Sequence, residues 1–189
     1  MLNEAGLIRK AQSGNAEAFR RLVEKHSPVI WTVINRMTLD PASAEDYFQE
    51  TIIRFWKGLP SFKGESKLST WLYKIAYRIC LDGIEAGKRK SREKSLDESL
   101  EEKGIEFESI DSSGEKIEND IAARDAIEKG LNKLNPEWRT MLILYYWKGL
   151  SMLEISDITG HPVNTVKVYM HRARAQLRNI LKVNGFPQE

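Results

Sequence analysis

Residues 151–162 limit the fold of this chain more tightly than any other stretch of the sequence. Ser151 is followed three residues later by Glu154, which is the spacing of a capping box at the start of a helix. Gly160 is well placed to end that helix, and Pro162 to begin another after a very short turn. Two helices joined by a tight glycine-containing turn form a helix-turn-helix. We therefore expect a helix-turn-helix near the C-terminus.

The helix that begins after Pro162 has two contrasting faces. An apolar seam recurs at spacings of three and four residues: Val163, Val166, Met170, Ala173, Leu177 and Ile180. The opposite face carries Asn164, Lys167, Val168, His171, Arg172 and Arg178. This face suits the major groove of DNA, because Lys and Arg bind guanine edges or phosphates, Asn binds adenine and Val contacts the thymine methyl. A terminal helix with a basic, solvent-exposed face is the alternative.

Helical periodicity covers most of the remaining chain. It runs over residues 15–37, 40–59, 69–90, 121–134 and 135–147, with a turn-rich loop at 60–68. Asn15 and Asn135 are suitable N-caps. Ser43, followed three residues later by Asp46, predicts the start of the second helix, and Pro28 predicts a bend in the first. Strand patterns are hard to find, so the predicted fold class is all-α.

Charge divides the chain into three parts. The formal net charge is +6 over residues 1–92, −8 over residues 93–120 and +4 over residues 121–189, within an overall +2. The acidic middle part has isolated apolar residues without a sustained period, so we expect a flexible linker between two small helical domains. Two basic domains joined by a linker suggest nucleic-acid partners. The alternative is that the charges of all three parts only face solvent and bind no partner.

Several function classes are disfavoured by the composition. No apolar run approaches the roughly 18 residues of a spanning helix, and the N-terminus lacks an apolar signal stretch, so we expect a cytoplasmic protein without membrane insertion. Cys80 is the single cysteine and the three histidines are scattered, so we expect neither a metal site nor a cofactor. Cys80 could sense oxidation, but a lone cysteine on an apolar helix is more often a small core residue.

The sequence resembles a known family in two blocks. "AEDYFQETIIRFWKGLPSFKGESKLSTWLYKIAYRICLD" (44–82) is similar to domain two of extracytoplasmic-function (ECF, group IV) sigma factors of the sigma-70 family. "LNKLNPEWRTMLILYYWKGLSMLEISDITGHPVNTVKVYMHRARAQLRNIL" (131–181) is similar to their domain four. The resemblance implies a non-enzymatic protein that binds bacterial core RNA polymerase and directs it to promoters. A stand-alone helix-turn-helix regulator is the alternative; a nucleic-acid enzyme would need clustered carboxylates, and here the acids are spread along one helix.

The resemblance also implies partners and a docking surface. The family's D-x-x-Q-E pattern is matched by Asp46, Gln49 and Glu50, with Phe55 beside them, and implies docking on the clamp helices of the largest polymerase subunit. Asp46 could instead serve the helix dipole, whereas Gln49 and Glu50 lie too far into the helix for that. Domain four implies contact with the β-subunit flap, and proteins of this type are usually restrained by an anti-sigma factor.

A second implied surface recognises and melts the minus-ten element. It comprises Phe62, Lys63, Gly64, Ser66, Lys67, Trp71, Lys74, Arg78, Lys88 and Arg89. An opened strand needs a pocket for an unstacked base and cations along its backbone, and a polar loop beside basic residues provides both. Trp71, Tyr73 and Tyr77 could stack on bases, but aromatics at helical spacing are more often core, so we expect Trp71 to shape the loop. Arg78 stands where the family commonly has Asn, which leaves the base preference there open.

A third implied surface reads the minus-35 element. It comprises Asn164, Thr165, Lys167, Val168, His171, Arg172 and Arg174, and most of these already lie on the face selected by the helical phase. Val168 replaces a frequent serine and Tyr169 a frequent arginine, so one phosphate contact is expected to be missing. By the same resemblance, the acidic linker would thread toward the active-site and RNA-exit channels of the polymerase.

Overall fold

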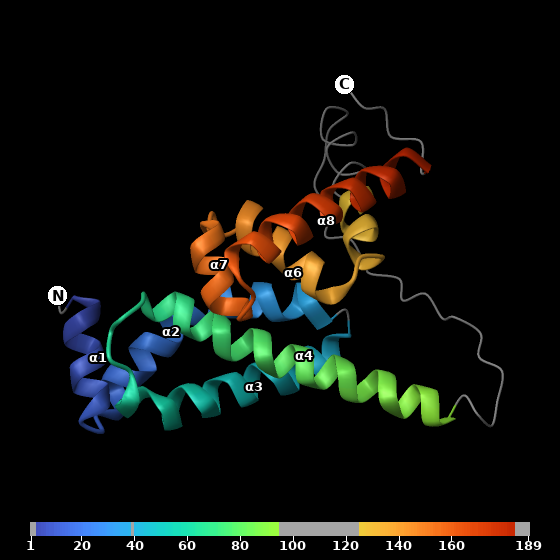
Figure 1. The fold of residues 1–189 in the computed structure, drawn as a ribbon. Helices are drawn as coiled ribbons and strands as arrows, with labels where there is room; N and C mark the ends of the chain where they lie inside the picture. The colour runs from blue at the N-terminus through green and yellow to red at the C-terminus, as the bar shows by residue number, and fades with distance from the viewer. Residues whose placement is uncertain (1–2, 39, 95–124, 184–189) are drawn as a thin grey trace, which may run out of the picture.

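The computed structural model describes residues 3–38, 40–94 and 125–183, and within these ranges every regular element is helical (Figure 1). This confirms the all-α prediction with two helical domains. The elements are α1 (Glu4–Gln12), α2 (Ala16–Thr38), α3 (Pro41–Gly58), a 3-10 turn η1 (Leu59–Ser61), α4 (Leu68–Lys94), a helical stretch at 125–132, α6 (Pro136–Tyr146), α7 (Met152–Thr159) and α8 (Val163–Val183). The predicted linker lies outside the described residues, except for its first two positions at the end of α4.

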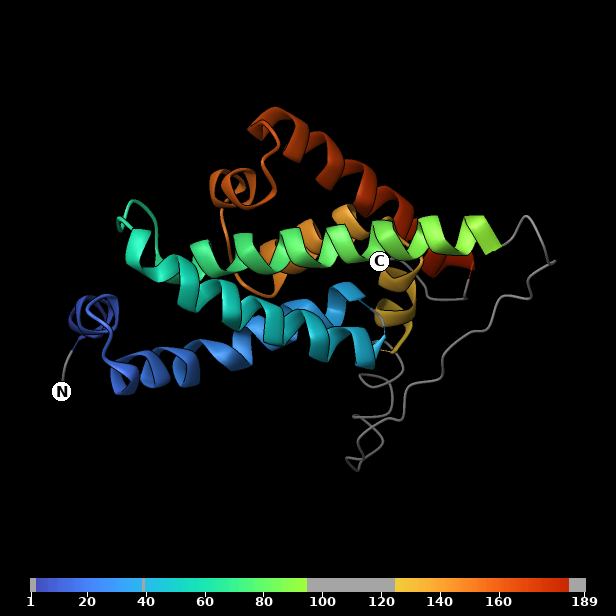
Figure 2. The same ribbon diagram turned by 90° about the horizontal axis from the view of Figure 1, so that it is seen from below.

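The N-terminal group consists of α2, α3 and α4 lying side by side, with α1 packed against the start of α2 (Figure 2). Their shared core is built from the apolar stripes that the periodicity predicted. Leu22, Ile34, Phe55 and Leu72 are all fully buried there. Burying a large apolar side chain of this kind stabilises the fold by about 1.5–3 kcal/mol relative to leaving it exposed.

The start of α3 differs from the sequence prediction. The helix begins at Pro41, and its N-cap is Asp40, whose Oδ2 accepts a hydrogen bond from the Ser43 amide at 2.9 Å. The Ser43 hydroxyl also donates to Asp40, so it does not cap the helix itself. An aspartate followed by proline suits the N-cap and first helical positions, which explains why the helix starts three residues earlier than expected. α2 continues through Pro28 as one helix.

The C-terminal group, α6–α8, has the predicted caps on α6 and α7, and α8 begins at Val163, directly after Pro162. Asn135 caps α6, and Pro136 occupies its first position. Ser151 and Glu154 form a complete capping box on α7, and Gly160 ends that helix with a φ of 77°, a left-handed conformation that favours glycine. α7 and α8 are therefore joined by the short turn that a helix-turn-helix requires.

The two groups of helices pack against each other. α7 lies against α4, and α6 lies against α2 (Figure 1). Within the described residues, no helix combines the length and apolarity needed to cross a membrane.

Candidate protein and nucleic-acid interfaces

An open groove lies between α2 and α3. Its volume is about 630 Å³, and it is lined by Ser27, Pro28, Trp31, Glu45, Phe48 and Gln49. The rings of Trp31 and Phe48 meet edge to face with centroids 5.6 Å apart, and Trp31 remains 37% exposed. Phe48 is half-buried, and a partly exposed aromatic pair in a groove with a polar rim is the composition of a protein-binding surface.

Of the four predicted docking residues, Gln49 lines this groove, and Asp46 and Glu50 lie on the same helix outside its lining. Asp46 and Gln49 are exposed, and Glu50 is half-buried and pairs with Arg54 at 2.7 Å. The fourth residue, Phe55, was assigned wrongly to the surface. It is fully buried, because it follows Asp46 by nine residues, and at about 100° per residue this places it on the opposite face of the helix.

Phe55 instead belongs to an aromatic cluster inside the N-terminal group. Its ring centroid lies 4.8 Å from that of Phe19 and 6.0 Å from that of Trp71. The sequence did not predict that Pro28, Trp31, Glu45 and Phe48 come together to line one groove. Trp31 carried a usable signal, since it is a large aromatic residue that lies off the apolar seam of α2.

The predicted minus-ten loop is held in place by packing and hydrogen bonds. Trp71 is half-buried, and its ring centroid lies 5.1 Å from that of Phe62, so it shapes the loop as expected. Gln12 reaches across from α1, and its side-chain amide donates to the carbonyls of Leu59 at 3.1 Å and Phe62 at 2.9 Å. Gly64 adopts a φ of 76°, which allows the turn beyond Phe62.

The basic residues of this surface fall into two groups. The first group is exposed to solvent and forms no ion pair with the C-terminal helices that the structure describes: Lys63, Arg78, Lys88 and Arg89. Lys67 and Lys74 are paired across to acidic residues of α7. Ser66 is half-buried and Gly64 exposed, which completes the predicted set around the loop. Tyr73 and Tyr77 are buried, so they are core residues rather than stacking platforms for bases.

α8 has the two faces that its sequence predicted. Val166, Met170 and Ala173 are fully buried in the seam. The exposed residues of the predicted DNA-facing set are Asn164, Lys167, Val168, His171, Arg172 and Arg174, and Thr165 is half-buried. Tyr169 points away from this face, because its ring lies 5.9 Å from Trp138 and 5.3 Å from His161. The side chain that replaces a frequent arginine therefore serves packing.

A further apolar surface was not predicted from the sequence. At the end of α6 and in the turn that follows, Tyr145, Tyr146 and Trp147 are exposed, and Leu153 of α7 is 71% exposed. Trp147 also lies under the Arg36 guanidinium, 5.0 Å from the ring centroid. Consecutive aromatic residues at a helix end carry little periodic signal, so only the structure identifies them as exposed.

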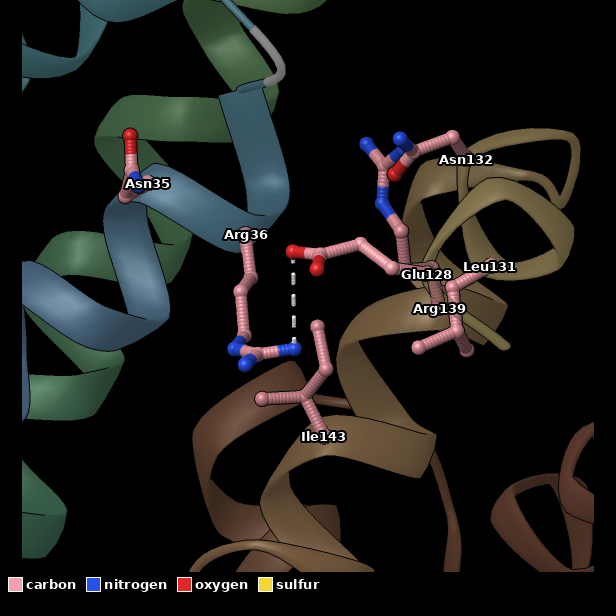
Figure 3. Close-up of a pocket in the computed structure, with 7 residues that line it drawn as sticks. All are labelled: Asn35, Arg36, Glu128, Leu131, Asn132, Arg139 and Ile143. Carbon is pink, nitrogen blue, oxygen red and sulfur yellow. Dashed lines mark ion pairs between the residues drawn. The ribbon is translucent and has the colours of Figure 1, made fainter. Parts of the chain in front are cut away.

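A small cavity lies where α2 meets the C-terminal helices (Figure 3). Its volume is about 30 Å³, and its lining includes Arg36, Glu128 and Arg139, with Arg36 and Glu128 paired at 3.9 Å. Arg139 is 2% exposed, and its Nη2 donates to the Met37 carbonyl. Burial lowers the pKa of Arg139 to about 10. This cavity has room for about one water molecule, so it is not a substrate site.

Side chains of the types that bind metal ions are not grouped together in the part of the chain that the structure describes. Within those residues no three His, Cys, Asp or Glu side chains are grouped in a way that could hold a metal ion. Cys80 is buried, and burial raises the pKa of its thiol to about 12, so the reactive thiolate is disfavoured. Cys80 therefore behaves as a core residue.

Comparisons with known proteins account for both groups of helices. Residues 22–90 match Sigma-70 region 2, and residues 124–177 match Sigma-70, region 4. The ECF RNA polymerase sigma factor SigW of Bacillus subtilis is 31% identical over 184 residues, which cover 93% of this chain and 95% of SigW. RNA polymerase sigma-H factor of Pseudomonas aeruginosa is also 31% identical, covering 93% of this chain and 92% of that protein.

Solved structures share the fold. The sigma factor RpoE of Bartonella quintana, solved in complex with the anti-sigma factor NepR, has a TM-score of 0.69 at 23% identity, covering 89% of this chain and 99% of RpoE. CnrH, solved with the cytosolic domain of CnrY, has a TM-score of 0.64 at 21% identity, covering 95% of this chain and 97% of CnrH. Two matched regions in the expected order and full-length relatives show that this chain belongs to the ECF sigma factors of the sigma-70 family, alternative sigma factors that direct RNA polymerase to promoters and initiate transcription.

Proposed function

We propose that this sigma factor divides its work among three surfaces, with residues 1–92 and 121–189 as its two functional domains. The α2–α3 groove docks on core polymerase, the loop at 62–67 with α4 binds the minus-ten element, and α8 reads the minus-35 element. The observation that carries the proposal is α8, where a seam with Val166, Met170 and Ala173 fully buried holds a polar and basic face toward solvent. Residues at the start of such a helix are the ones that reach base edges.

The docking surface combines the groove with the acidic and amide side chains beside it. Gln49 lines the groove with the Trp31–Phe48 pair, and Asp46 is exposed on the same helix. We propose that clamp helices of the largest polymerase subunit lie along this groove, with apolar contact at the aromatic pair and hydrogen bonds at its rim. Aromatic residues at the centre of an interface commonly supply most of its binding free energy. The exposed Tyr146 and Leu153 offer a second apolar surface for the β-subunit flap.

The minus-ten surface suits an opened DNA strand. Gln12 and Trp71 hold the loop, while Lys63 and Arg78 are exposed around it to contact phosphates. Lys88 and Arg89 extend the same basic character along α4. Arg78 replaces the family's usual asparagine, so we propose a phosphate or stacking contact there instead of a base-specific hydrogen bond.

The membership of the family and the related complexes support a proposal for regulation and location. RpoE was solved in complex with the anti-sigma factor NepR, and CnrH with the cytosolic domain of CnrY. We propose that an anti-sigma factor binds and restrains this protein. We further propose that it acts in the cytoplasm, where core polymerase is found, without a cofactor, a metal ion or a catalytic site of its own.

In vitro transcription tests the proposal directly. Purified bacterial core polymerase and this protein are incubated with a pool of genomic fragments, and the RNA 5′ ends are mapped by sequencing. We expect discrete start sites that require the protein and share two upstream elements. A Gln49→Ala and Trp31→Ala double variant should lose core binding, whereas Lys133→Ala, at an exposed position that belongs to none of the three surfaces, should retain it.

The stand-alone regulator makes a different prediction in the same experiment. It would bind specific duplex DNA tightly without polymerase and would give no protein-dependent start sites. Absence of both core binding and start sites, with tight operator binding by the protein alone, would overturn the sigma assignment of the surfaces.

A further inference from the structure

We propose that Gln12 of α1 is a positioning residue for the opened DNA strand. Its side-chain amide fixes the peptide group that joins Phe62 to Lys63, and so sets the direction in which Lys63 leaves the loop. The proposal rests on the minus-ten role proposed for this loop and adds the residue that orients it. Gln12 precedes residues 22–90, the part of the chain that matches Sigma-70 region 2, and it acts without touching DNA.

One side-chain amide holds two backbone carbonyls. Gln12 Nε2 donates to the Leu59 carbonyl at 3.1 Å and to the Phe62 carbonyl at 2.9 Å. A glutamine amide nitrogen carries two hydrogens, so both are used here. The Leu59 carbonyl also accepts the Phe62 amide at 3.0 Å. Among the residues that the structure describes, the Phe62 carbonyl depends on Gln12 for its hydrogen bond.

The Phe62 carbonyl belongs to the peptide group that leads into Lys63. Because a peptide group is planar, holding its oxygen also fixes the orientation of the Lys63 amide and the path of the chain into Lys63. Phe62 has a ψ of 114°, and Gly64, one residue past Lys63, turns the chain with a φ of 76°. Lys63 is exposed between these two fixed points. The hydrogen bond from Gln12 therefore controls where the Lys63 cation is presented.

The helix that carries Gln12 is itself held at its other end. The Glu4 carboxylate pairs with Lys25 of α2, and Glu4 Oε2 lies 3.2 Å from His26 Nε2. Glu4 and Gln12 are eight residues apart, which is about 12 Å along a helix. α1 packs against the start of α2 and against η1 (Figure 2). With its first turn anchored on α2, α1 presents the Gln12 amide to the loop at a fixed position.

Packing and hydrogen bonding restrain different parts of Phe62. Its ring lies 5.1 Å from that of Trp71, so the side chain is held by aromatic contact, whereas the carbonyl is held by Gln12. Without the amide, the carbonyl is free to turn toward water while the ring stays in place. Lys63 would then sample more orientations, and the entropy of ordering it would be lost when the DNA strand binds.

Replacing the amide by a side chain of similar length tests the proposal without a change of charge. Gln12→Met retains an unbranched side chain but has no hydrogen-bond donor. Gln176→Met makes the same change at an exposed position of α8 that belongs to none of the three surfaces. The two variants should bind core polymerase equally well, because the docking groove lies between α2 and α3. All comparisons are made well below the thermal denaturation midpoint of each variant.

Strand binding by the holoenzyme is the main measurement. The probe is a fluorescent single-stranded oligonucleotide that carries the non-template minus-ten sequence of a promoter mapped by in vitro transcription. Ordering the backbone of one residue costs free energy equivalent to about fivefold or more in affinity, so Gln12→Met should bind the probe about fivefold more weakly than Gln176→Met. Equal affinities of the two variants would overturn the proposal.

A double-mutant cycle with Lys63→Ala tests whether Gln12 acts through Lys63. If it does, Gln12→Met should weaken probe binding by less than about twofold once Lys63 has been replaced, because the side chain that it orients is gone. A merely structural role of Gln12 would give the same loss with and without Lys63. A full fivefold loss in the Lys63→Ala background would therefore overturn the proposal.

The outcomes separate this proposal from the proposed function. Promoter-specific starts from the wild type, with equal probe binding by Gln12→Met and Gln176→Met, would retain the minus-ten surface and reject Gln12 as its positioning residue. Promoter-specific starts, with probe binding that Lys63→Ala leaves unchanged, would retain the sigma factor and reject Lys63 as the group that Gln12 orients. A wild-type protein that gives no start sites would overturn the proposed function, and this proposal with it, before any variant is compared.

Discussion

The α8 face and the minus-ten surface are both assigned to DNA, but they are built in different ways. The α8 face lies on one helix, and its orientation is set by the buried seam of Val166, Met170 and Ala173. The minus-ten surface is assembled from α1, the loop after η1 and α4, and it contacts α7. The first surface therefore depends on one helical phase, and the second on tertiary packing. Substitutions should affect the two surfaces in correspondingly different ways.

The largest expected effect is on the packing beneath the minus-ten surface. Phe55→Ala should lower the free energy of unfolding by about 3–5 kcal/mol, because it removes a fully buried ring that contacts Phe19 and Trp71. Urea denaturation followed by circular dichroism measures this change. Ile53→Ala, at a 46% exposed position on the same helix, should change it by less than about 0.5 kcal/mol. Similar losses for the two variants would contradict the burial of Phe55.

The next effect should appear in promoter binding rather than stability. Arg172→Ala should weaken recognition of the minus-35 element by about 1–3 kcal/mol, since this exposed side chain is available for a base or phosphate contact. Holoenzyme affinity for promoter fragments with an intact or a scrambled upstream element measures the loss. Lys133→Ala removes one positive charge away from the α8 face and should have a much smaller effect. If Arg172→Ala lowers the affinity for the scrambled fragment by the same amount, Arg172 contacts the phosphate backbone and not a base.

These two predictions show what the sequence could and could not supply. Helix caps and the phase of α8 are local, so Ser151, Gly160 and the exposed Lys167 were all predicted from spacing alone. Phe55 was misplaced because it was grouped with the nearby acidic residues, although the helical rotation from Asp46 puts it on the buried side. Its spacing from Asp46 already contained the information needed for the correct assignment.

Features that join separate helices were not predictable from one sequence. The groove needs Trp31 of α2 beside Phe48 of α3, and periodicity within each helix does not fix which helices become neighbours. The same holds for the pairing of Lys74 with Asp157, 83 residues further along the chain. Net charge indicated that both domains are basic, but it could not show that acidic residues of one domain face lysines of the other.

A smaller effect is expected at the helix-turn-helix. Ser151→Ala should lower the free energy of unfolding by about 1 kcal/mol, because the Glu154 amide loses its hydrogen-bond acceptor while the Glu154 carboxylate keeps the Ser151 amide. The Ser151 amide and the Ser151 hydroxyl both donate to the Glu154 carboxylate, which holds the pKa of Glu154 below its usual value. Ser151→Thr keeps a capping hydroxyl and should recover most of the loss. Thermal denaturation compares the three proteins, and an unchanged midpoint for Ser151→Ala would show that the cap contributes little.

The smallest predicted effect is a dependence of stability on pH through His26 in the N-terminal group. His26 is 8% exposed, and burial lowers its pKa despite the Glu4 carboxylate 3.2 Å from its Nε2. The unfolded chain therefore takes up a proton near pH 6.5, where the folded chain does not, and the free energy of unfolding falls as the pH drops below that value. The stability that depends on His26 is fully present above the pKa of this histidine in the unfolded chain. The slope of the unfolding free energy against pH should correspond to a difference of less than one bound proton between the unfolded and folded chains.

Urea denaturation between about pH 8 and pH 5 measures this dependence, because a histidine titrates in that range while ordinary carboxylates titrate below it. Glu4, whose hydrogen bond from Lys25 lowers its pKa, contributes its own loss only below its usual value of 4.5. His26→Gln should flatten the profile, and His171→Gln, at an exposed position on α8, should leave it unchanged. Stability that rises as the pH falls from 7 to 5.5 would mean that the ion pair with Glu4 outweighs the burial of the ring, which would reverse the sign argued for this site.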